Sequence, residues 1–228
     1  MYTRQQVAAT IDHAVLKPFA TNQDVIDGCE MCKKFKVASM CVRPSDVPLA
    51  AKHLKDSVVK TSVVVGFPHG SNCTETKALE ARLALEQGAE EIDMVMNVGK
   101  FLSGDMDYVQ RDIEAVVAEA RKKQGLVKVI QETCYLSPEQ VAQACKLCEA
   151  AGADYVKTST GFGDGPATPE VIDIMIKTVG QTMGVKASGG VRTWDTAVGY
   201  LDQGCKRLGV GSTEAVLTGA PDDNNESY

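Results

Sequence analysis

The sequence predicts a single-domain α/β protein folded as a (β/α)8 barrel, or TIM barrel, and three observations lead to this prediction. Eight short runs rich in apolar or β-branched residues recur along the chain. A longer segment follows each run, and several of these segments carry the apolar period of a helix. The 228 residues fit eight such units near the small end of the size range for these barrels. Strands that alternate with helices form βαβ units, so we expect a parallel sheet.

The predicted strands cover residues 11–16, 38–42, 61–67, 91–97, 126–133, 154–159, 184–189 and 207–211. A helix is predicted over residues 105–123, where one apolar stripe contains Val109, Ile113, Val116, Val117 and Ala120. A second is predicted over residues 74–87, with Gly88 as its stop. A third begins at Ser137, which is a good N-cap and is followed by Pro138 in the first helical position.

A doubly wound open sheet is the alternative, and it usually places a GxGxxG turn after its first strand. The corresponding segment here reads LKPFATNQD, which contains no glycine. The chain shows no linker and no low-complexity segment, so residues 1–218 are predicted to form one domain. The polar, acidic residues 219–228 (GAPDDNNESY) are expected to form a mobile tail.

The bulk composition excludes several classes of partner. A net charge of −6 and a pI near 5.2 argue against nucleic acid. No apolar run reaches the roughly 18 residues that a membrane-spanning helix needs. The first residues lack the apolar core of a signal peptide, so we expect a cytoplasmic protein.

The eight cysteines include two CxxC pairs, which a metal or redox site would explain. The pairs follow helical spacing within apolar segments, and they lie too far apart in sequence for a zinc module. We therefore interpret Cys29, Cys32, Cys145 and Cys148 as packing residues. The histidines are not spaced as metal ligands either, and we interpret them as structural: His13, His53 and His69. No metal and no cofactor is predicted.

Polar residues interrupt the apolar strands at six positions: Asp12, Cys41, Asp93, Glu132, Lys157 and Lys186. Any one of them could point into the helix layer or form a structural ion pair. Several together are harder to explain that way, since barrel interiors prefer branched apolar residues and active sites form at the carboxyl ends of the strands.

Lys157 and Lys186 fall on the sixth and seventh strands, which are neighbours roughly 4.8 Å apart. Burial and a second positive charge both lower the pKa of a lysine. An unperturbed lysine is a free amine in only about one molecule in 2,500 at pH 7. The second lysine therefore serves to make the first one a nucleophile toward carbonyl groups.

The loops after the seventh and eighth strands, ASGGVR (187–192) and GVGSTEA (209–215), suit a phosphate group. TIM barrels often bind phosphate at these two places through backbone N–H groups. The glycine pair Gly189–Gly190 and the start of a short helix at Ser212 fit this pattern.

Six segments together resemble the deoxyribose-phosphate aldolase family, in order along residues 11 to about 213: IDHAVLKP, VVVGFPHG with TETKALEA, EIDMVMNVG, LVKVIQETCYL, ADYVKTSTGF and GVKASGGVR. The resemblance implies a TIM barrel and a class I aldolase that needs no metal. The implied reaction is the reversible cleavage of 2-deoxy-D-ribose 5-phosphate to D-glyceraldehyde 3-phosphate and acetaldehyde through a lysine Schiff base. The substrate is a small phosphorylated sugar, and a homodimer or a higher homo-oligomer is expected.

The resemblance also implies roles for individual residues. Lys157 falls on the Schiff-base lysine, and Lys186 on the second lysine, which perturbs the pKa and relays protons. Asp93 falls on the proton donor and acceptor, with Asp12 in a supporting position. Substrate contacts fall on Thr160, Gly189, Gly190, Gly211, Ser212 and Cys41. Some family members end in a tyrosine that assists proton transfer, which here is Tyr228, and some have a lysine where this chain has Phe162.

Two other functions remain open at this point. A sugar-phosphate isomerase or epimerase would use Glu132 or Asp93 as its base and Lys186 as an electrophile, but it leaves Lys157 without a task. A non-catalytic phosphate-binding barrel would keep both lysines in ion pairs with ordinary reactivity.

Overall fold

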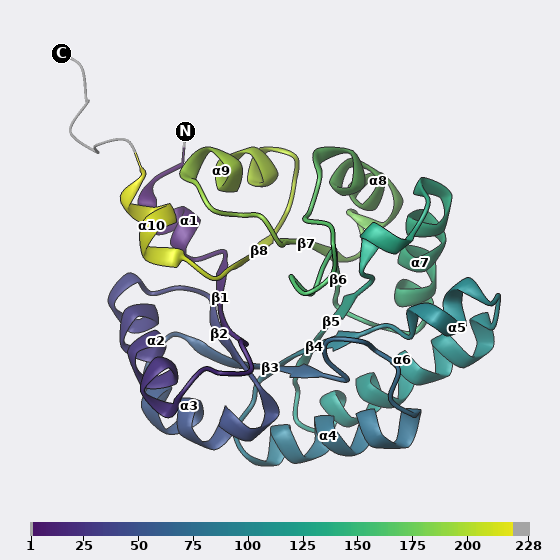
Figure 1. The fold of residues 1–228 in the computed structure, drawn as a ribbon, viewed down its shortest axis with the longest axis horizontal. Coiled ribbons are helices and arrows are strands. Elements are labelled where there is room, and N and C mark those ends of the chain that lie inside the picture. The colour runs from purple at the N-terminus through teal and green to yellow at the C-terminus, as the bar shows by residue number, and fades with distance from the viewer. Residues whose placement is uncertain (1, 221–228) are drawn as a thin grey trace.

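The computed structural model describes residues 2–220 and forms a closed barrel of eight parallel strands inside a ring of helices (Figure 1). The strands are β1 (Ile11–Val15), β2 (Ser39–Val42), β3 (Lys60–Val65), β4 (Glu91–Val95), β5 (Leu126–Ile130), β6 (Tyr155–Lys157), β7 (Gly184–Ser188) and β8 (Arg207–Val210). They pair in chain order, and β8 closes on β1. The predicted TIM barrel is confirmed.

A helix follows every strand. These are α2 (Asn22–Phe35), α3 (Val47–Leu54), α4 (Thr74–Glu86), α6 (Met106–Arg121), α7 (Pro138–Ala150), α8 (Pro169–Val179), α9 (Trp194–Asp202) and α10 (Thr213–Thr218). Short helices α1 (Arg4–Ala8) and α5 (Val98–Leu102) and the 3-10 turns η1 (Pro44–Asp46) and η2 (Thr133–Tyr135) complete the chain. The N-cap predicted at Ser137 is confirmed, because its side chain accepts a hydrogen bond from the backbone N–H of Gln140.

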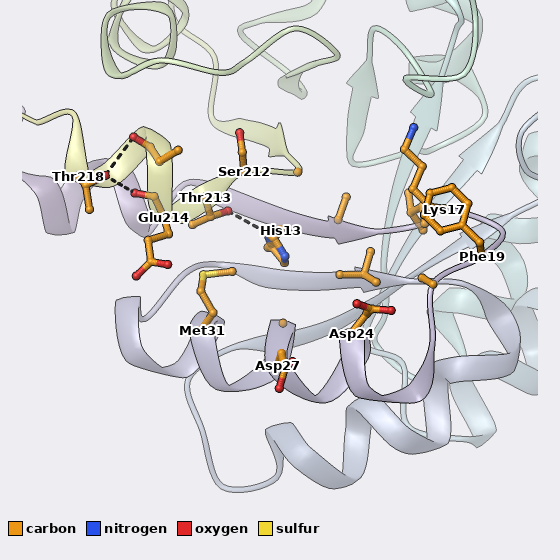
Figure 2. A pocket seen from close by; sticks show the side chains of 17 residues that line it. His13, Lys17, Phe19, Asp24, Asp27, Met31, Ser212, Thr213, Glu214 and Thr218 are labelled. Carbon is orange, nitrogen blue, oxygen red and sulfur yellow. Dashed lines mark hydrogen bonds between the residues drawn. The ribbon is translucent and has the colours of Figure 1, made fainter.

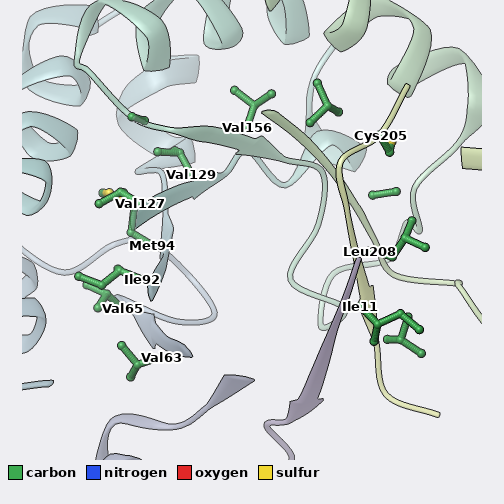
Figure 3. Packing of buried hydrophobic residues seen from close by; sticks show 14 of the residues in the cluster. Ile11, Val63, Val65, Ile92, Met94, Val127, Val129, Val156, Cys205 and Leu208 are labelled. Carbon is green, nitrogen blue, oxygen red and sulfur yellow. The ribbon is translucent and has the colours of Figure 1, made fainter. Parts of the chain in front are cut away.

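The apolar core lies mainly between the strands and the helix ring, and Figure 3 shows side chains of β3, β4 and β5 that belong to it. The CxxC cysteines belong to this layer and are fully buried on α2 and α7. Burial raises the pKa of the Cys29 and Cys145 thiols to about 11, so they stay protonated and unreactive. Their interpretation as packing residues is confirmed.

Most of the predicted strands extend past the observed carboxyl ends, by two or three residues in β3, β4, β5 and β6. β5 ends at Ile130, because Glu132 adopts a left-handed conformation with φ of 49° and the chain then turns through η2. β6 ends at Lys157; the Thr158 N–H still donates to the Lys186 carbonyl at 3.2 Å, and the Thr158 hydroxyl donates to the carbonyl of Ser188 at the end of β7. The turns begin early because side chains there bond the backbone of neighbouring loops.

One buried ion pair fixes the end of β4 to the helix ring. Lys77 on α4 is fully buried, and its ammonium donates to the Val95 carbonyl at 2.9 Å and to the Asp112 carboxylate on α6 at 2.5 Å. The carboxyl end of β4 is thereby held two residues beyond Asp93.

Helix α10 ends at Thr218, and the structure describes Gly219 and Ala220 after it. The boundary between the domain and the acidic tail therefore stays a prediction, and Tyr228 lies outside the described residues. None of the helices in residues 2–220 combines the length and apolar character that crossing a membrane requires.

Candidate active site

A cavity of about 350 Å³ opens at the carboxyl ends of the barrel strands. Most of the predicted site residues line it: Asp12, Cys41, Lys157, Thr160, Lys186, Gly189, Gly190, Gly211 and Ser212. Asp93 is fully buried and contacts both cavity lysines. Residues from strands far apart in sequence are therefore gathered at one mouth, as the barrel topology predicts.

The two lysines lie opposite one another on β6 and β7, where Lys157 pairs in register with Lys186. Both ammonium nitrogens contact the same Asp93 oxygen, Oδ2, at 2.7 Å. The two nitrogens can therefore be no farther apart than twice that distance. The predicted proximity of the lysines is confirmed, and a shared carboxylate holds them together.

Lys186 has a second partner that Lys157 lacks. Its nitrogen lies 2.5 Å from Asp12 Oδ2, and Asp12 also accepts a hydrogen bond from the Ser39 hydroxyl at 2.6 Å. Both lysines line the cavity, but Lys186 is held between two carboxylates, whereas Lys157 contacts only one.

Three further charged residues, which the sequence analysis missed, extend this network toward the amino ends of the strands. Lys128 on β5 is fully buried and contacts Asp93 Oδ1 at 2.8 Å and Glu91 at 2.6 Å. Arg207 bridges Glu91 at 2.5 Å and Asp12 at 2.6 Å. The interior of the barrel is therefore an ion network and not an apolar plug.

The pKa values of Lys157 and Lys186 are shifted in opposite directions. Burial lowers the pKa of Lys157, the charge of Lys186 adds to that effect, and Asp93 opposes it without overcoming it. Burial also works against the charged form of Lys186, but Asp12 and Asp93 together outweigh it and raise the pKa of Lys186. Lys157 is the lysine that loses its proton most readily.

The number of charges supports the same conclusion. The network contains four basic side chains (Lys128, Lys157, Lys186 and Arg207) and three acidic ones (Asp12, Glu91 and Asp93). Burial would raise the pKa of both Asp12 and Asp93, but the neighbouring lysines outweigh it and hold each pKa below its usual range. The network thus has one more basic side chain than acidic side chains, so its formal charges balance when one basic side chain is neutral, and Lys157 is the one whose pKa is lowered.

Two polar residues near the lysines serve other purposes. Burial raises the pKa of the Cys41 thiol to about 11, so it is a neutral wall of the cavity. Glu132 does not line the lysine cavity; its carboxylate accepts hydrogen bonds from the Thr160 backbone N–H at 3.1 Å and from the Thr160 hydroxyl. Glu132 therefore fixes the loop after β6.

The loops after β7 and β8 present backbone donors to the cavity. Gly189 and Gly190 both have positive φ, near 80°, and a side chain at Gly190 would meet Pro166 at 2.8 Å. The backbone N–H groups of Gly189, Gly190, Gly211 and Ser212 donate to no acceptor within residues 2–220. These donors are available to an anion in the cavity.

A second, larger cavity of about 730 Å³ lies between β1, α2 and α10, and it does not include the lysine pair (Figure 2). His13 lines it, with its Nδ1 2.9 Å from the Thr213 hydroxyl, and burial lowers the pKa of His13 to about 4. A neutral histidine bonded to α10 agrees with its structural interpretation. No cluster of three or more His, Cys, Asp or Glu side chains suited to a metal occurs in the described part of the chain.

The mouth of this TIM barrel holds a lysine with a lowered pKa, a carboxylate paired with it and backbone N–H groups without acceptors among the described residues. These groups suit a carbon–carbon lyase that acts on carbonyl compounds. The chain belongs to the DeoC/LacD family of aldolases, whose model matches residues 6–208. It is an enzyme of that family, an aldehyde-lyase, and the resemblance seen in the sequence is confirmed.

Individual relatives agree with this assignment. The chain is 49% identical over 216 residues to the deoxyribose-phosphate aldolase of Thermococcus gammatolerans, covering 94% of this chain and 96% of that one. It is 50% identical over 214 residues to that of Clostridium novyi, with coverages of 94% and 96%. Among solved structures, the tetrameric deoxyribose phosphate aldolase from Aeropyrum pernix superposes with a TM-score of 0.89 at 30% identity, covering 95% of this chain and 91% of that one.

Proposed function

We propose that this enzyme reversibly cleaves 2-deoxy-D-ribose 5-phosphate to D-glyceraldehyde 3-phosphate and acetaldehyde, with Lys157 as the covalent catalyst. The observation that carries the proposal is the asymmetric lysine pair at the cavity, in which Lys157 contacts one carboxylate and has a lowered pKa, whereas Lys186 contacts two and has a raised pKa. The relatives named above that carry out this reaction share about half of their residues with this chain.

The reaction begins at Lys157. Its neutral amine attacks the C1 aldehyde of the open-chain sugar, and loss of water gives an iminium. A base accepts the proton of the C3 hydroxyl while the C2–C3 bond breaks, so that D-glyceraldehyde 3-phosphate leaves and its bonding electrons form an enamine. Protonation of the enamine carbon and hydrolysis of the resulting iminium release acetaldehyde and restore the amine.

Asp93 and Lys186 suit the proton transfers. Asp93 is ionised and lies 2.7 Å from the Lys157 nitrogen, so it stabilises the iminium and accepts protons, directly or through water. Lys186 stays protonated and lies 2.7 Å from the same oxygen, so it can return a proton to Asp93. Asp12 supports Lys186 as its second carboxylate partner.

The substrate's phosphate group is bound by the loops after β7 and β8 in this proposal. The unpartnered N–H groups at Gly189, Gly190, Gly211 and Ser212 are its ligands, and Thr160 and Cys41 line the space for the sugar. The isomerase alternative has less support, because Glu132 is bonded to Thr160 and stands away from the lysine cavity.

The test is chemical trapping. Acetaldehyde with cyanoborohydride should attach a single ethyl group to the native enzyme, and peptide mapping should find it on Lys157. The Lys157→Met variant, folded as judged by circular dichroism, should take no label at this site. A label on Lys186, or none on the native protein, would reject the mechanism, and an isomerase would also escape labelling.

We further infer a cytoplasmic homo-oligomer that acts on a small phosphorylated sugar and not on nucleic acid or membranes. Leu79 and Leu83 expose 45% and 44% of their surface on one face of α4, which is where a second copy could bury them. Light scattering of the purified protein, with Leu83→Glu as the disrupting variant, tests this.

A further inference from the structure

Two basic side chains line the lysine cavity in addition to Lys157 and Lys186: Lys17 and Arg192. Lys157 and Lys186 are engaged with Asp93 deep in the barrel. No carboxylate of residues 2–220 lies within ion-pair distance of Lys17 or Arg192. The mouth therefore holds cations that are not neutralised by neighbouring acids.

The backbone at Lys17 is fixed by Arg43. The Arg43 guanidinium donates to the carbonyls of Lys17 at 3.1 Å, Pro18 at 3.3 Å and Ala20 at 3.0 Å. Arg43 is itself held by the buried Asp46 carboxylate at 2.6 Å. The loop between β1 and α2 is thus tied down along its length, and no comparable contact holds the Arg192 side chain within residues 2–220.

The position of the Lys17 side chain is also fixed by a contact. Its ammonium lies 5.1 Å from the centre of the Phe162 ring, and Phe162 packs edge-on against Phe67 with centroids 5.2 Å apart. The Lys17 side chain extends away from α2 and from Asp24 (Figure 2). A cation over an aromatic face is attracted and oriented, yet its charge remains available to an anion.

The order of the strands shows what lies beneath this contact. Lys17 follows β1 and Phe162 follows β6, and the closed barrel places β7 and β8 between those two strands. The contact therefore spans the sector of the mouth that contains Gly189, Gly190 and Gly211, and all of these residues line one cavity. An anion on the glycine amides would lie in the same cavity as the Lys17 ammonium.

We propose that Lys17, set in place by Arg43 and Phe162, is the cation that binds the substrate's phosphate and makes the enzyme selective for phosphorylated sugars. The proposal rests on the proposed function. Neutral amides alone leave a phosphate dianion without a counter-charge, and hydrogen bonds from an ammonium to phosphate are about twice as strong as neutral ones.

The experiment compares Lys17→Met with Lys123→Met. Lys123 is exposed beyond α6 at the opposite end of the barrel, so its replacement changes the net charge equally without touching the mouth. For Lys17→Met, kcat/KM for 2-deoxyribose 5-phosphate relative to that for 2-deoxyribose should fall roughly ten- to a hundredfold, mainly through KM. Lys17→Arg should restore part of the ratio, and Lys123→Met should leave it unchanged.

Binding of inorganic phosphate, measured by calorimetry, provides a readout that does not depend on catalysis. Lys17→Met should weaken it by a similar factor, whereas the cyanoborohydride trapping of Lys157 by acetaldehyde tests the proposed function separately. Equal losses on both sugars, or unchanged phosphate affinity in Lys17→Met, would overturn the assignment to Lys17.

Discussion

Replacing Lys186 with leucine should raise the pKa of Lys157 and slow the enzyme at neutral pH. In the native site Lys186 adds to the effect of burial in lowering that pKa. Its removal also leaves Asp93 with one cation fewer, so Asp93 attracts the Lys157 proton more strongly. Both effects favour the ammonium form, which cannot attack a carbonyl group.

The magnitude follows from the geometry. The two nitrogens share one Asp93 oxygen at 2.7 Å each. Two positive charges about 5 Å apart repel by roughly 3 kcal/mol at an effective dielectric constant of ~20. That energy changes the fraction of free amine by about two orders of magnitude. Activity at neutral pH should fall by a similar factor.

The direction in which the pH–activity profile moves can also be predicted. Below the pKa of Lys157, activity falls tenfold for each pH unit, and a higher pKa displaces this slope toward alkaline pH. The loss in Lys186→Leu should therefore shrink as the pH rises and vanish above both pKa values. The assay is the rate of cyanoborohydride trapping of acetaldehyde, which reports imine formation without the later proton transfers.

Lys128→Met is a matched comparison, because Lys128 contacts Asp93 on its other oxygen and does not line the cavity. It should displace the profile in the same direction as Lys186→Leu. Thermal unfolding must show that both variants are folded, since breaking a buried ion pair costs about 3 to 5 kcal/mol. A loss in Lys186→Leu that stays constant over the whole pH range would refute pKa depression as its role.

Three further predictions concern the loop after β6, metals and the tail. Glu132→Gln weakens the hold on Thr160 and should raise KM several-fold while leaving the trapping of Lys157 intact; unchanged steady-state kinetics would contradict that positioning role. Strong chelators should leave activity unchanged, because an iminium withdraws electrons as a Lewis acid would; a loss restored by one added metal would speak against this. Tyr228→Phe should slow solvent deuterium exchange into the acetaldehyde methyl group with little change in KM, and exchange at the native rate would show that this phenol has no part.

The sequence was sufficient for the barrel and for the residues at its mouth, since strand periodicity and strand order decide both. Lys157 and Lys186 lie on strands that were predicted to be neighbours, and the observed register places the two residues opposite each other. Asp93 and Asp12 interrupt apolar runs in the same way. For these residues, a polar side chain within an apolar strand was enough to indicate a position at the mouth of the barrel.

The part of the ion network nearer the amino ends of the strands, formed by Lys128, Glu91 and Arg207, was not predictable by that reasoning. Lys128 stands between valines on β5, an alternation that would also suit a lysine facing outward. Glu91 and Arg207 begin their strands, and charged residues at a strand's start are usually solvated. Their inward direction depends on one another, because each is tolerated inside the barrel only through the opposite charges of the others.

The barrel interior has one more basic side chain than acidic side chains, and this has a consequence for ligand binding. In the proposed mechanism, a neutral Lys157 gains a positive charge when an aldehyde converts it to an iminium, and that reaction consumes a proton from solution. The positive charge on the Lys157 nitrogen therefore forms only when substrate binds, and it forms 2.7 Å from the Asp93 carboxylate oxygen. In a calorimeter, acetaldehyde binding should release a heat that varies with the ionisation enthalpy of the buffer, and the slope of that variation would measure the proton taken up.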